Sequence, residues 1–239
     1  MIGLFDSGSG GLAALRAIRE GAPKADLVYF ADEANLPYGE KTEEELISLA
    51  RAAIHRLLHE GAEYILAACG TASSVALPTL ARECPVPLYG ILDPTAMASA
   101  RAWRERGGRI LVLGTRATVE KGALTAKIGE FATHAPTLSL ACPDFVTLSE
   151  AYNSTQKDER EQRIRASLSP VLSEEVGVVV LGCTHFSRLG EEIGACFPRA
   201  AVVDGATEAA QAMLDDLPPA ALHGSSRTIL RSSGRKDFT

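Results

Sequence analysis

The sequence lacks long apolar runs, clusters of basic residues and a leader-like beginning. No apolar run approaches the roughly 18 residues that a membrane-spanning helix needs. The net charge is −6 and no basic cluster is present, which argues against a nucleic-acid-binding surface. Residues 1–6 carry neither a basic region nor a long apolar core, so we expect no signal peptide. These absences predict a cytoplasmic protein that binds no membrane and no nucleic acid and acts on a small molecule.

Cysteine is scarce, and its count is odd. The five cysteines are Cys69, Cys84, Cys142, Cys183 and Cys196. An odd number in a cytoplasmic chain favours free thiols over a disulfide framework. No Cys-x-x-Cys pair is present, so zinc has no obvious ligand set and we expect no metal site.

The composition and the order of the apolar segments predict an α/β fold. Hydrophobic residues make up 46% of the chain and charged residues 23%, which is typical of a packed globular protein. Apolar segments typical of strands alternate with segments of helical spacing, as in folds built on parallel sheets. The expected strands are residues 2–5, 26–31, 64–69, 86–91, 109–113, 137–141, 178–183, 201–204 and 228–231.

This alternation occurs twice, with a break near Pro94. We therefore predict two similar three-layer α/β/α lobes with mostly parallel sheets. The first lobe is expected to comprise residues 1–94 plus the tail, 205–239, and the second lobe residues 95–204. In the second lobe, Pro143, Phe145 and Glu150 are expected in a loop. In the first lobe, Thr42 and Glu45 have the spacing of a capping box at the start of a helix.

Two stretches, residues 64–71 and 178–185, share one design. Each is an apolar run that stops at a cysteine, Cys69 or Cys183, followed by a threonine and an amphipathic segment. Each cysteine is therefore expected at the carboxyl end of a strand and the amino end of a helix, where open α/β sheets bind ligands. The helix dipole there also favours a thiolate. The pair suggests a reaction that needs two matched acid/base groups.

The glycine-rich segment after the first strand allows a different interpretation. Residues 8–13 fit the pattern G-x-G-x-x-A of dinucleotide-binding loops, with Asp32 at the end of the next strand. However, Asp6 immediately precedes the loop, and its carboxylate would repel a pyrophosphate. Asp6 beside backbone N–H groups is better suited to polarising a neighbouring group and binding an ammonium. A purely structural turn is a third alternative.

The two cysteines and their neighbours also have purely structural interpretations. A buried cysteine is usually an inert small apolar residue, and Cys84 and Cys196 are assigned to that class. His185 lies two residues after Cys183, where it could set the protonation of the thiol. It could equally make only a local hydrogen bond. The matched placement of Cys69 and Cys183 favours the chemical interpretation.

These residues lie in a series of blocks that resembles the glutamate racemase family of the aspartate/glutamate racemase superfamily. The blocks extend over nearly the whole chain, and their order and spacing are specific. They are residues 5–11 (FDSGSGG), 31–32, 36–41 (LPYGEK), 68–73, 90–94, 114–115, 142–150 and 181–186 (LGCTHF). The last block is close to a signature of the family.

The resemblance implies a cofactor-independent racemase with its active site in the cleft between the two lobes. It implies that Cys69 and Cys183 face opposite sides of the substrate Cα. One thiolate would remove the α-proton, and the other thiol would donate a proton from the far side. Asp6 would assist Cys69, His185 would assist Cys183, and Glu150 matches an acidic residue of the site. Because the α-proton is weakly acidic without a cofactor, a site of this kind must exclude water and stabilise a carbanion.

The resemblance also implies a substrate and the residues that hold it. The expected reaction converts L-glutamate to D-glutamate, which supplies peptidoglycan and hence cell-wall synthesis, and we expect a homodimer. The positions that match substrate-binding residues of the family are Ser7, Pro37, Tyr38, Gly39, Gly70, Thr71 and Thr184.

One position departs from the family pattern in a way that bears on the substrate. Gly70 stands where the family has an asparagine whose side chain contacts the substrate. Losing a buried amide contact typically costs about 1–3 kcal/mol. Two alternatives therefore stay open: a racemase of another amino acid, such as aspartate or a broader set, and a catalytically weak amino-acid-binding relic of the fold.

Overall fold

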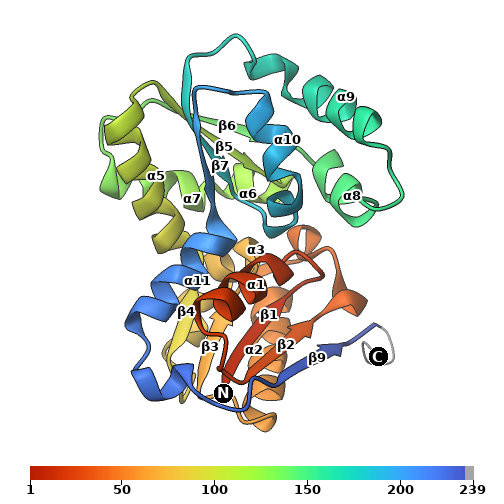
Figure 1. The fold of residues 1–239 in the computed structure, drawn as a ribbon, viewed down its shortest axis with the longest axis vertical. Helices are drawn as coiled ribbons and strands as arrows, with labels where there is room; N and C mark the ends of the chain where they lie inside the picture. The colour runs from red at the N-terminus through yellow and green to blue at the C-terminus, as the bar shows by residue number, and fades with distance from the viewer. Residues whose placement is uncertain (235–239) are drawn as a thin grey trace. The chain divides into compact units, whose positions relative to one another are not determined.

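The structure is a computed structural model that describes residues 1–234. It divides into two compact units (Figure 1). The first unit runs from Met1 to Leu92 and resumes at Ala206, and the second comprises Asp93–Gly205. Residues 235–239, which the sequence assigned to the first lobe, lie outside the described residues.

The first unit contains a five-stranded sheet in the order β4-β3-β1-β2-β9. All of its neighbouring strands pair in parallel. The strands are β1 (Ile2–Asp6), β2 (Leu27–Ala31), β3 (Tyr64–Ala67), β4 (Leu88–Gly90) and β9 (Thr228–Ser232). Strand β9 is an edge strand beside β2, so the tail does return to the first sheet.

Helices pack on both faces of this sheet. They are α1 (Leu12–Gly21), α2 (Glu43–His59), α3 (Gly70–Val75), α4 (Leu77–Leu80) and α11 (Gly205–Asp216). Alternate strand residues point to opposite faces: Leu27 and Tyr29 join a core with α1 and α11, whereas Val28 and Phe30 join a core with α2, α3 and α4. The central strands β1, β2 and β3 are buried on both faces, which is why they are rich in apolar residues, whereas the edge strands β4 and β9 are only partly buried.

The second unit contains a four-stranded parallel sheet in the order β6-β5-β7-β8. The strands are β5 (Arg109–Gly114), β6 (Thr137–Ala141), β7 (Val176–Leu181) and β8 (Ala201–Asp204). The helices are α5 (Leu92–Arg106), α6 (Arg116–Lys121), α7 (Ala123–Phe131), α8 (Asp144–Glu150), α9 (Lys157–Leu168) and α10 (Gly190–Ala195). One core joins β5 and β7 to α8, α9 and α10. The predicted α/β architecture with two mostly parallel sheets is confirmed.

The structure corrects or refines three local predictions. The segment that carries Phe145 and Glu150 is not a loop but the short helix α8, whose buried Phe145 and Leu148 are spaced one helical turn apart. The helix expected after Cys183 begins as the 3-10 helix η4 (Thr184–Leu189), and the α-helix α10 begins only at Gly190. Strand β4 is also shorter than the predicted run of residues 86–91.

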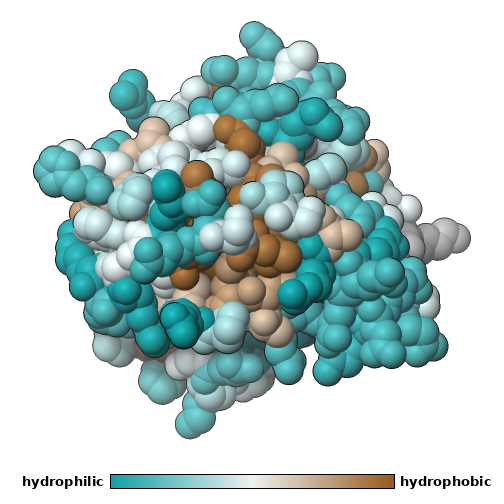
Figure 2. Space-filling view, turned by 90° about the horizontal axis from the view of Figure 1, so that it is seen from above, coloured by the Kyte–Doolittle hydropathy of each residue, from teal (hydrophilic) through white to brown (hydrophobic). Residues whose placement is uncertain are grey.

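The surface of the described residues carries few large apolar side chains. Those that are exposed in residues 1–234 are Met97 and Val202. Figure 2 shows one face on which apolar residues gather near the centre of a largely hydrophilic surface. No helix among the described residues is long and apolar enough to cross a membrane.

Helix α2 begins with the predicted capping box. The Thr42 hydroxyl accepts a hydrogen bond from the Glu45 N–H (3.3 Å), and Glu45 Oε2 accepts one from the Thr42 N–H (2.8 Å). Two N–H groups that the helix cannot pair internally are therefore satisfied.

We expect Thr42→Ala to destabilise the first unit by about 1 kcal/mol, because the hydroxyl that caps α2 is lost. A loss of this size corresponds to a fall in melting temperature of roughly 2–4 °C. Melting followed by far-UV circular dichroism measures it. Thr42→Ser keeps the hydroxyl and should melt close to the wild type. An equal loss in both variants would contradict the role of the cap.

Candidate active site

The first cluster of candidate residues begins at the carboxyl end of β1, where Asp6 is the last residue of the strand. The Asp6 side chain is fully buried. Its Oδ1 accepts hydrogen bonds from the Gly8 N–H (2.8 Å) and the Ser7 hydroxyl (3.3 Å). Gly11 closes the turn at a point where a Cβ would lie only 2.8 Å from the Asp6 Cβ. A buried carboxylate inside this turn would repel a pyrophosphate, which argues against the dinucleotide alternative.

Cys69 lies beside this turn because β3 runs parallel to β1. Neighbouring parallel strands end at the same edge of a sheet. Cys69 follows β3 and immediately precedes α3, is 5% exposed, and places its Sγ 3.9 Å from the Ser7 hydroxyl oxygen. Gly70 and Thr71 form the first turn of α3 and are half-buried.

Tyr38 also belongs to this cluster and comes from the loop after β2. Its hydroxyl donates to Asp32 Oδ2 (2.7 Å), and the Asn35 amide donates to both Asp32 carboxylate oxygens (3.0 and 3.1 Å). Burial raises the pKa of Tyr38, and the neighbouring acidic groups of Asp32, Cys69 and Asp6 raise it further. The Tyr38 hydroxyl therefore stays protonated at neutral pH and remains a hydrogen-bond donor.

The first cysteine cluster is defined as Asp6, Ser7, Asp32, Tyr38 and Cys69. The other candidate residues of this loop are Pro37, which is exposed, and Gly39, which is half-buried; they flank Tyr38 in the chain. In the sequence analysis Asp32 appears in a dinucleotide motif and in one of the family blocks, but it was not assigned to the site, and Asn35 was not considered. Their spacing from Tyr38 carries no recognised motif, so only the folded loop shows the contact.

The second cysteine cluster, Glu150, Cys183 and His185, lies at the carboxyl end of β7 in the other unit. The Cys183 Sγ lies 3.8 Å from Nδ1 of His185. The His185 Nε2 lies 2.9 Å from Oε1 of Glu150, the last residue of α8. The imidazole is 5% exposed and the Glu150 side chain 47%. Thr184 lies between the cysteine and the histidine in the chain and is buried.

This order of groups determines what the imidazole can do. A carboxylate accepts a hydrogen bond from Nε2–H, so the neutral ring carries its hydrogen on Nε2 and presents the lone pair of Nδ1 to Cys183. In the tautomer assigned from this hydrogen bond, Nδ1 can accept the thiol proton of Cys183. The imidazolium that forms would be stabilised by Glu150, so the cluster can supply a thiolate.

Helix α8 and η4, which carry Glu150 and His185, pack directly against each other. The rings of Phe145 on α8 and Phe186 on η4 meet edge to face, with centroids 5.2 Å apart. Both rings are fully buried. This contact fixes the separation of the two elements and hence of the carboxylate and the imidazole.

The cysteines outside the two clusters differ in their surroundings. Burial raises the pKa of Cys142 to about 12, and its Sγ lies 3.9 Å from the Leu140 carbonyl oxygen. Burial also raises the pKa of Cys196. Both thiols therefore stay protonated at neutral pH, as expected of structural cysteines.

Metal ligands are not grouped in the described part of the chain. Residues 1–234 contain no set of three or more His, Cys, Asp or Glu side chains that could hold a metal ion. His55 and His59, one helical turn apart on α2, are both exposed.

Comparison with known proteins places the chain in a family. A family model described as Asp/Glu/Hydantoin racemase matches residues 3–213. The chain belongs to this racemase family. It is 38% identical over 220 residues to a glutamate racemase of Gloeobacter violaceus, covering 92% of this chain and 81% of that protein. It is 37% identical over 210 residues to a glutamate racemase of Thermus thermophilus, covering 88% and 77% of the two chains.

Solved structures of the racemase family share the fold. Glutamate racemase isoform RacE1 from Bacillus anthracis superimposes with a TM-score of 0.88 at 26% identity, covering 98% of this chain and 89% of that one. Glutamate racemase from Thermus thermophilus in complex with β-chloro-D-alanine gives a TM-score of 0.82 at 34% identity, covering 98% and 88%. The resemblance to the aspartate/glutamate racemase superfamily drawn from the sequence is therefore confirmed.

We expect Tyr38→Phe to lower the free energy of unfolding by about 1–3 kcal/mol, because the Asp32 carboxylate loses the hydrogen bond that it accepts from the Tyr38 hydroxyl. The difference between wild type and variant should be constant below pH 10. It should shrink above pH 10, because the phenol ionises in the unfolded chain while the raised pKa keeps it neutral in the folded one. Urea denaturation from pH 8 to pH 11 measures the difference. A difference that stayed constant to pH 11 would contradict a raised pKa at Tyr38.

Proposed function

We propose that the protein racemises glutamate by a two-thiol mechanism that needs no cofactor. The observation that carries the proposal is the pair of cysteine clusters, each placing a thiol beside polar partners at the carboxyl end of a parallel sheet. Family membership supports it, as do the relatives named glutamate racemase.

The chemistry is the transfer of one proton away from Cα and of another back to it. One cysteine, as thiolate, takes the α-proton, and the electron pair of the C–H bond stays on the substrate as a carbanion conjugated with the carboxylate. The other cysteine, as thiol, then donates its proton to the opposite face. The thiol and thiolate have exchanged places, which suits either enantiomer as substrate. Proton transfer by a positioned group contributes about 10²–10⁴-fold to a rate.

The two thiols would be assisted by different neighbours. In the second cluster, His185 would accept the Cys183 proton while Glu150 stabilises the imidazolium. In the first cluster, the Ser7 hydroxyl lies 3.9 Å from the Cys69 Sγ and donates to the buried Asp6, so Asp6 would assist Cys69 through Ser7. We propose that both clusters act on one α-carbon and that the two compact units are the two lobes of the enzyme.

The substrate carries two carboxylates and an ammonium, and each needs polar partners. We propose that hydroxyls and backbone N–H groups at the two strand edges bind them. The residues proposed for this role are Ser7, Pro37, Tyr38, Gly39, Gly70, Thr71 and Thr184. D-glutamate made in the cytoplasm by a homodimer of this chain would supply peptidoglycan synthesis.

The amino acid at position 70 favours a second candidate function. Gly70 brings no side-chain amide to the first turn of α3, where the family resemblance expects asparagine. A substrate with a shorter side chain, such as aspartate, is therefore the second candidate. Exchange of the α-hydrogen in deuterated water, measured for each amino acid in turn, separates the candidates. Exchange fastest with glutamate supports the first, and fastest with another amino acid the second.

We expect L-glutamate to lose its optical rotation when it is incubated with the protein. Cys69→Ser and Cys183→Ser should each lower the rate by at least about 100-fold, since each removes one acid/base group. Circular dichroism of the amino acid measures the rate, and far-UV spectra verify that the variants are folded. Cys84→Ser, at a half-buried cysteine outside both clusters, should retain the wild-type rate.

Two results would contradict this function. If neither enantiomer of glutamate nor any other amino acid is racemised or exchanged, the protein is not a racemase under these conditions and the relic alternative stands. If either serine variant keeps its activity, the two-thiol mechanism is wrong.

A further inference from the structure

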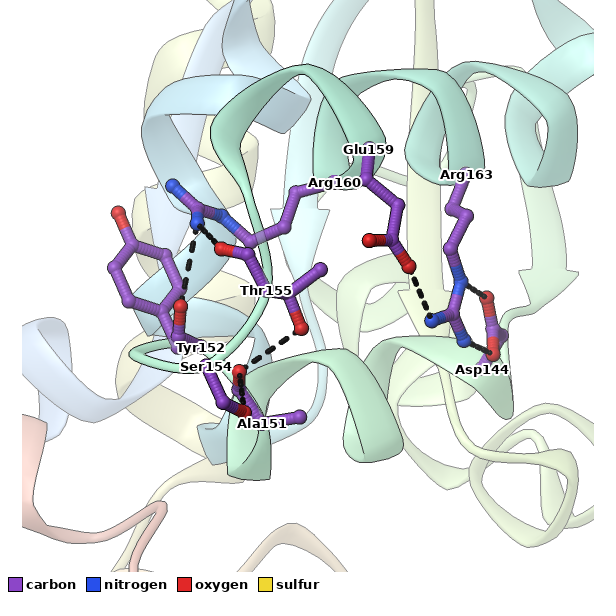
Figure 3. Close-up of polar contacts among 8 residues, drawn as sticks. All are labelled: Asp144, Ala151, Tyr152, Ser154, Thr155, Glu159, Arg160 and Arg163. Atoms are coloured by element: carbon purple, nitrogen blue, oxygen red, sulfur yellow. Dashed lines mark hydrogen bonds and ion pairs between the residues drawn. The ribbon is translucent and has the colours of Figure 1, made fainter.

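A buried arginine on α9, Arg160, contacts the turn that follows Glu150 of the second cysteine cluster (Figure 3). Arg160 is 7% exposed. Its Nη1 donates to the carbonyl oxygens of Tyr152 (3.2 Å) and Thr155 (2.6 Å). Its guanidinium also stacks over the Tyr152 ring, 3.9 Å from the ring centroid. The arginine thus holds the turn of residues 151–155, which begins directly after Glu150.

The same guanidinium reaches the element that follows His185. Nε and Nη2 of Arg160 both contact Oε1 of Glu192, at 3.2 and 3.1 Å. Glu192 is buried on α10, which directly continues η4, the 3-10 helix that carries His185. Arg160 therefore joins the segment after Glu150 to the segment after His185.

Helix α8 is held at its other end by a second arginine of α9. Arg163 makes two hydrogen bonds to Asp144, the first residue of α8, and a longer contact of 3.7 Å to Glu159 (Figure 3). Arg163 is partly exposed, with 37% of its side chain accessible. The two arginines, three residues apart, thus fix the beginning of α8 and the turn after its end.

The ion pair of Arg160 and Glu192 is poorly explained as a source of stability alone. Burying two charges is costly, and a buried pair is often no more stable than apolar residues of the same size. Within the described residues, Glu192 Oε2 is also buried without a hydrogen-bond partner. What the pair does provide is a fixed orientation of the segments it joins, because the planar guanidinium donates to two carbonyls and one carboxylate at fixed angles.

We propose that Arg160 is a positioning residue that holds Glu150 against His185. The inference deepens the proposed function, because it concerns the groups that would activate Cys183. Arg160 does not touch the thiol or the imidazole. It acts by fixing the turn after Glu150 to α10, while the Phe145–Phe186 contact fixes the apolar side of α8 against η4. Lysine cannot replace it, because an ammonium is a single point charge without the flat, forked geometry.

The test uses paired variants of the full chain. Arg160→Met alone leaves the Glu192 carboxylate buried and unpaired, so the informative variant is R160M/E192M, which replaces both charges with apolar side chains of similar length. Arg163→Met is the matched control: the same substitution on the same helix, at the far end of α8. Glu150→Gln serves as the reference for a lost carboxylate, and far-UV melting verifies folding.

The first readout is spectroscopic and does not depend on turnover. The ¹⁵N signals of the His185 ring, assigned with His185→Gln, report whether Glu150 still accepts the Nε2 hydrogen bond. We expect R160M/E192M to shift these signals toward those of Glu150→Gln, and R163M to leave them at the wild-type position. Unchanged signals in R160M/E192M would overturn the proposal, and so would an equal shift in R163M. If R160M/E192M does not fold, the His185 signals of R160K are compared in the same way. A shift toward those of Glu150→Gln supports the proposal, and unchanged signals overturn it.

The second readout is kinetic. We expect R160M/E192M to lower kcat by up to about 100-fold, as misplacement of a catalytic group by about 1 Å can do, while KM changes little. The combined variant should have the kcat of Glu150→Gln alone, because Arg160 has nothing left to position once the Glu150 carboxylate is gone. Additive losses would overturn the proposal. A wild type without racemase activity would refute the proposed function, yet the His185 signals would still test the role of Arg160.

Discussion

Parallel strand pairing is the constraint on which the rest of the structure depends. In each sheet, all strands run in one direction, so their carboxyl ends lie along one edge. In the first unit this brings together groups from strands far apart in sequence: Asp6 at the end of β1, Asp32 after β2 and Cys69 after β3. In the second unit the same edge receives Cys183 after β7, and α8 delivers Glu150 to it. The placement of the residues that follow these strands depends on this single topological rule.

The two clusters place their thiols in different electrostatic surroundings. Cys69 lies beside the Ser7 hydroxyl, which donates to the fully buried Asp6 carboxylate, whereas Cys183 lies beside an imidazole whose other nitrogen contacts the Glu150 carboxylate. A reaction with one proton acceptor and one proton donor needs two thiols that can each hold either protonation state. The proposed roles of His185 and Glu150 meet that need for Cys183. They also give a reason for the buried Arg160, which fixes the turn after Glu150.

The sequence predicted the elements that are decided by long apolar patterns. The runs ending near Asp6, Cys69 and Cys183 are strands as expected, because a strand buried on both faces must be apolar throughout. Helix α8 was missed because it has only seven residues and is stabilised by packing of Phe145 against Phe186 more than by its own propensity. Segment 184–189 was predicted only as a helix of unspecified type, because residue types alone do not distinguish a 3-10 helix from the first turn of an α-helix.

The candidate residues were predictable where a motif carried them, and not elsewhere. Asp6, Cys69, Cys183 and His185 lie in blocks with a specific order and spacing. Arg160 lies in a polar stretch with charges on all sides of its helix, and nothing in the pattern distinguishes it from the partly exposed Arg163. Its burial arises from tertiary contacts with Glu192 and the turn after Glu150, which only the folded chain brings together.

The most direct test of two thiols acting on one carbon is which enantiomer carries deuterium at Cα when L-glutamate is racemised in deuterated water. At early times the D-enantiomer should carry deuterium at Cα, because it receives its proton from a thiol that has exchanged with solvent, while the remaining L-enantiomer keeps its original hydrogen. Nuclear magnetic resonance of the separated enantiomers measures both. Equal deuterium in the two enantiomers from the start, or a D-enantiomer that keeps the original hydrogen, would contradict the mechanism and indicate a single base.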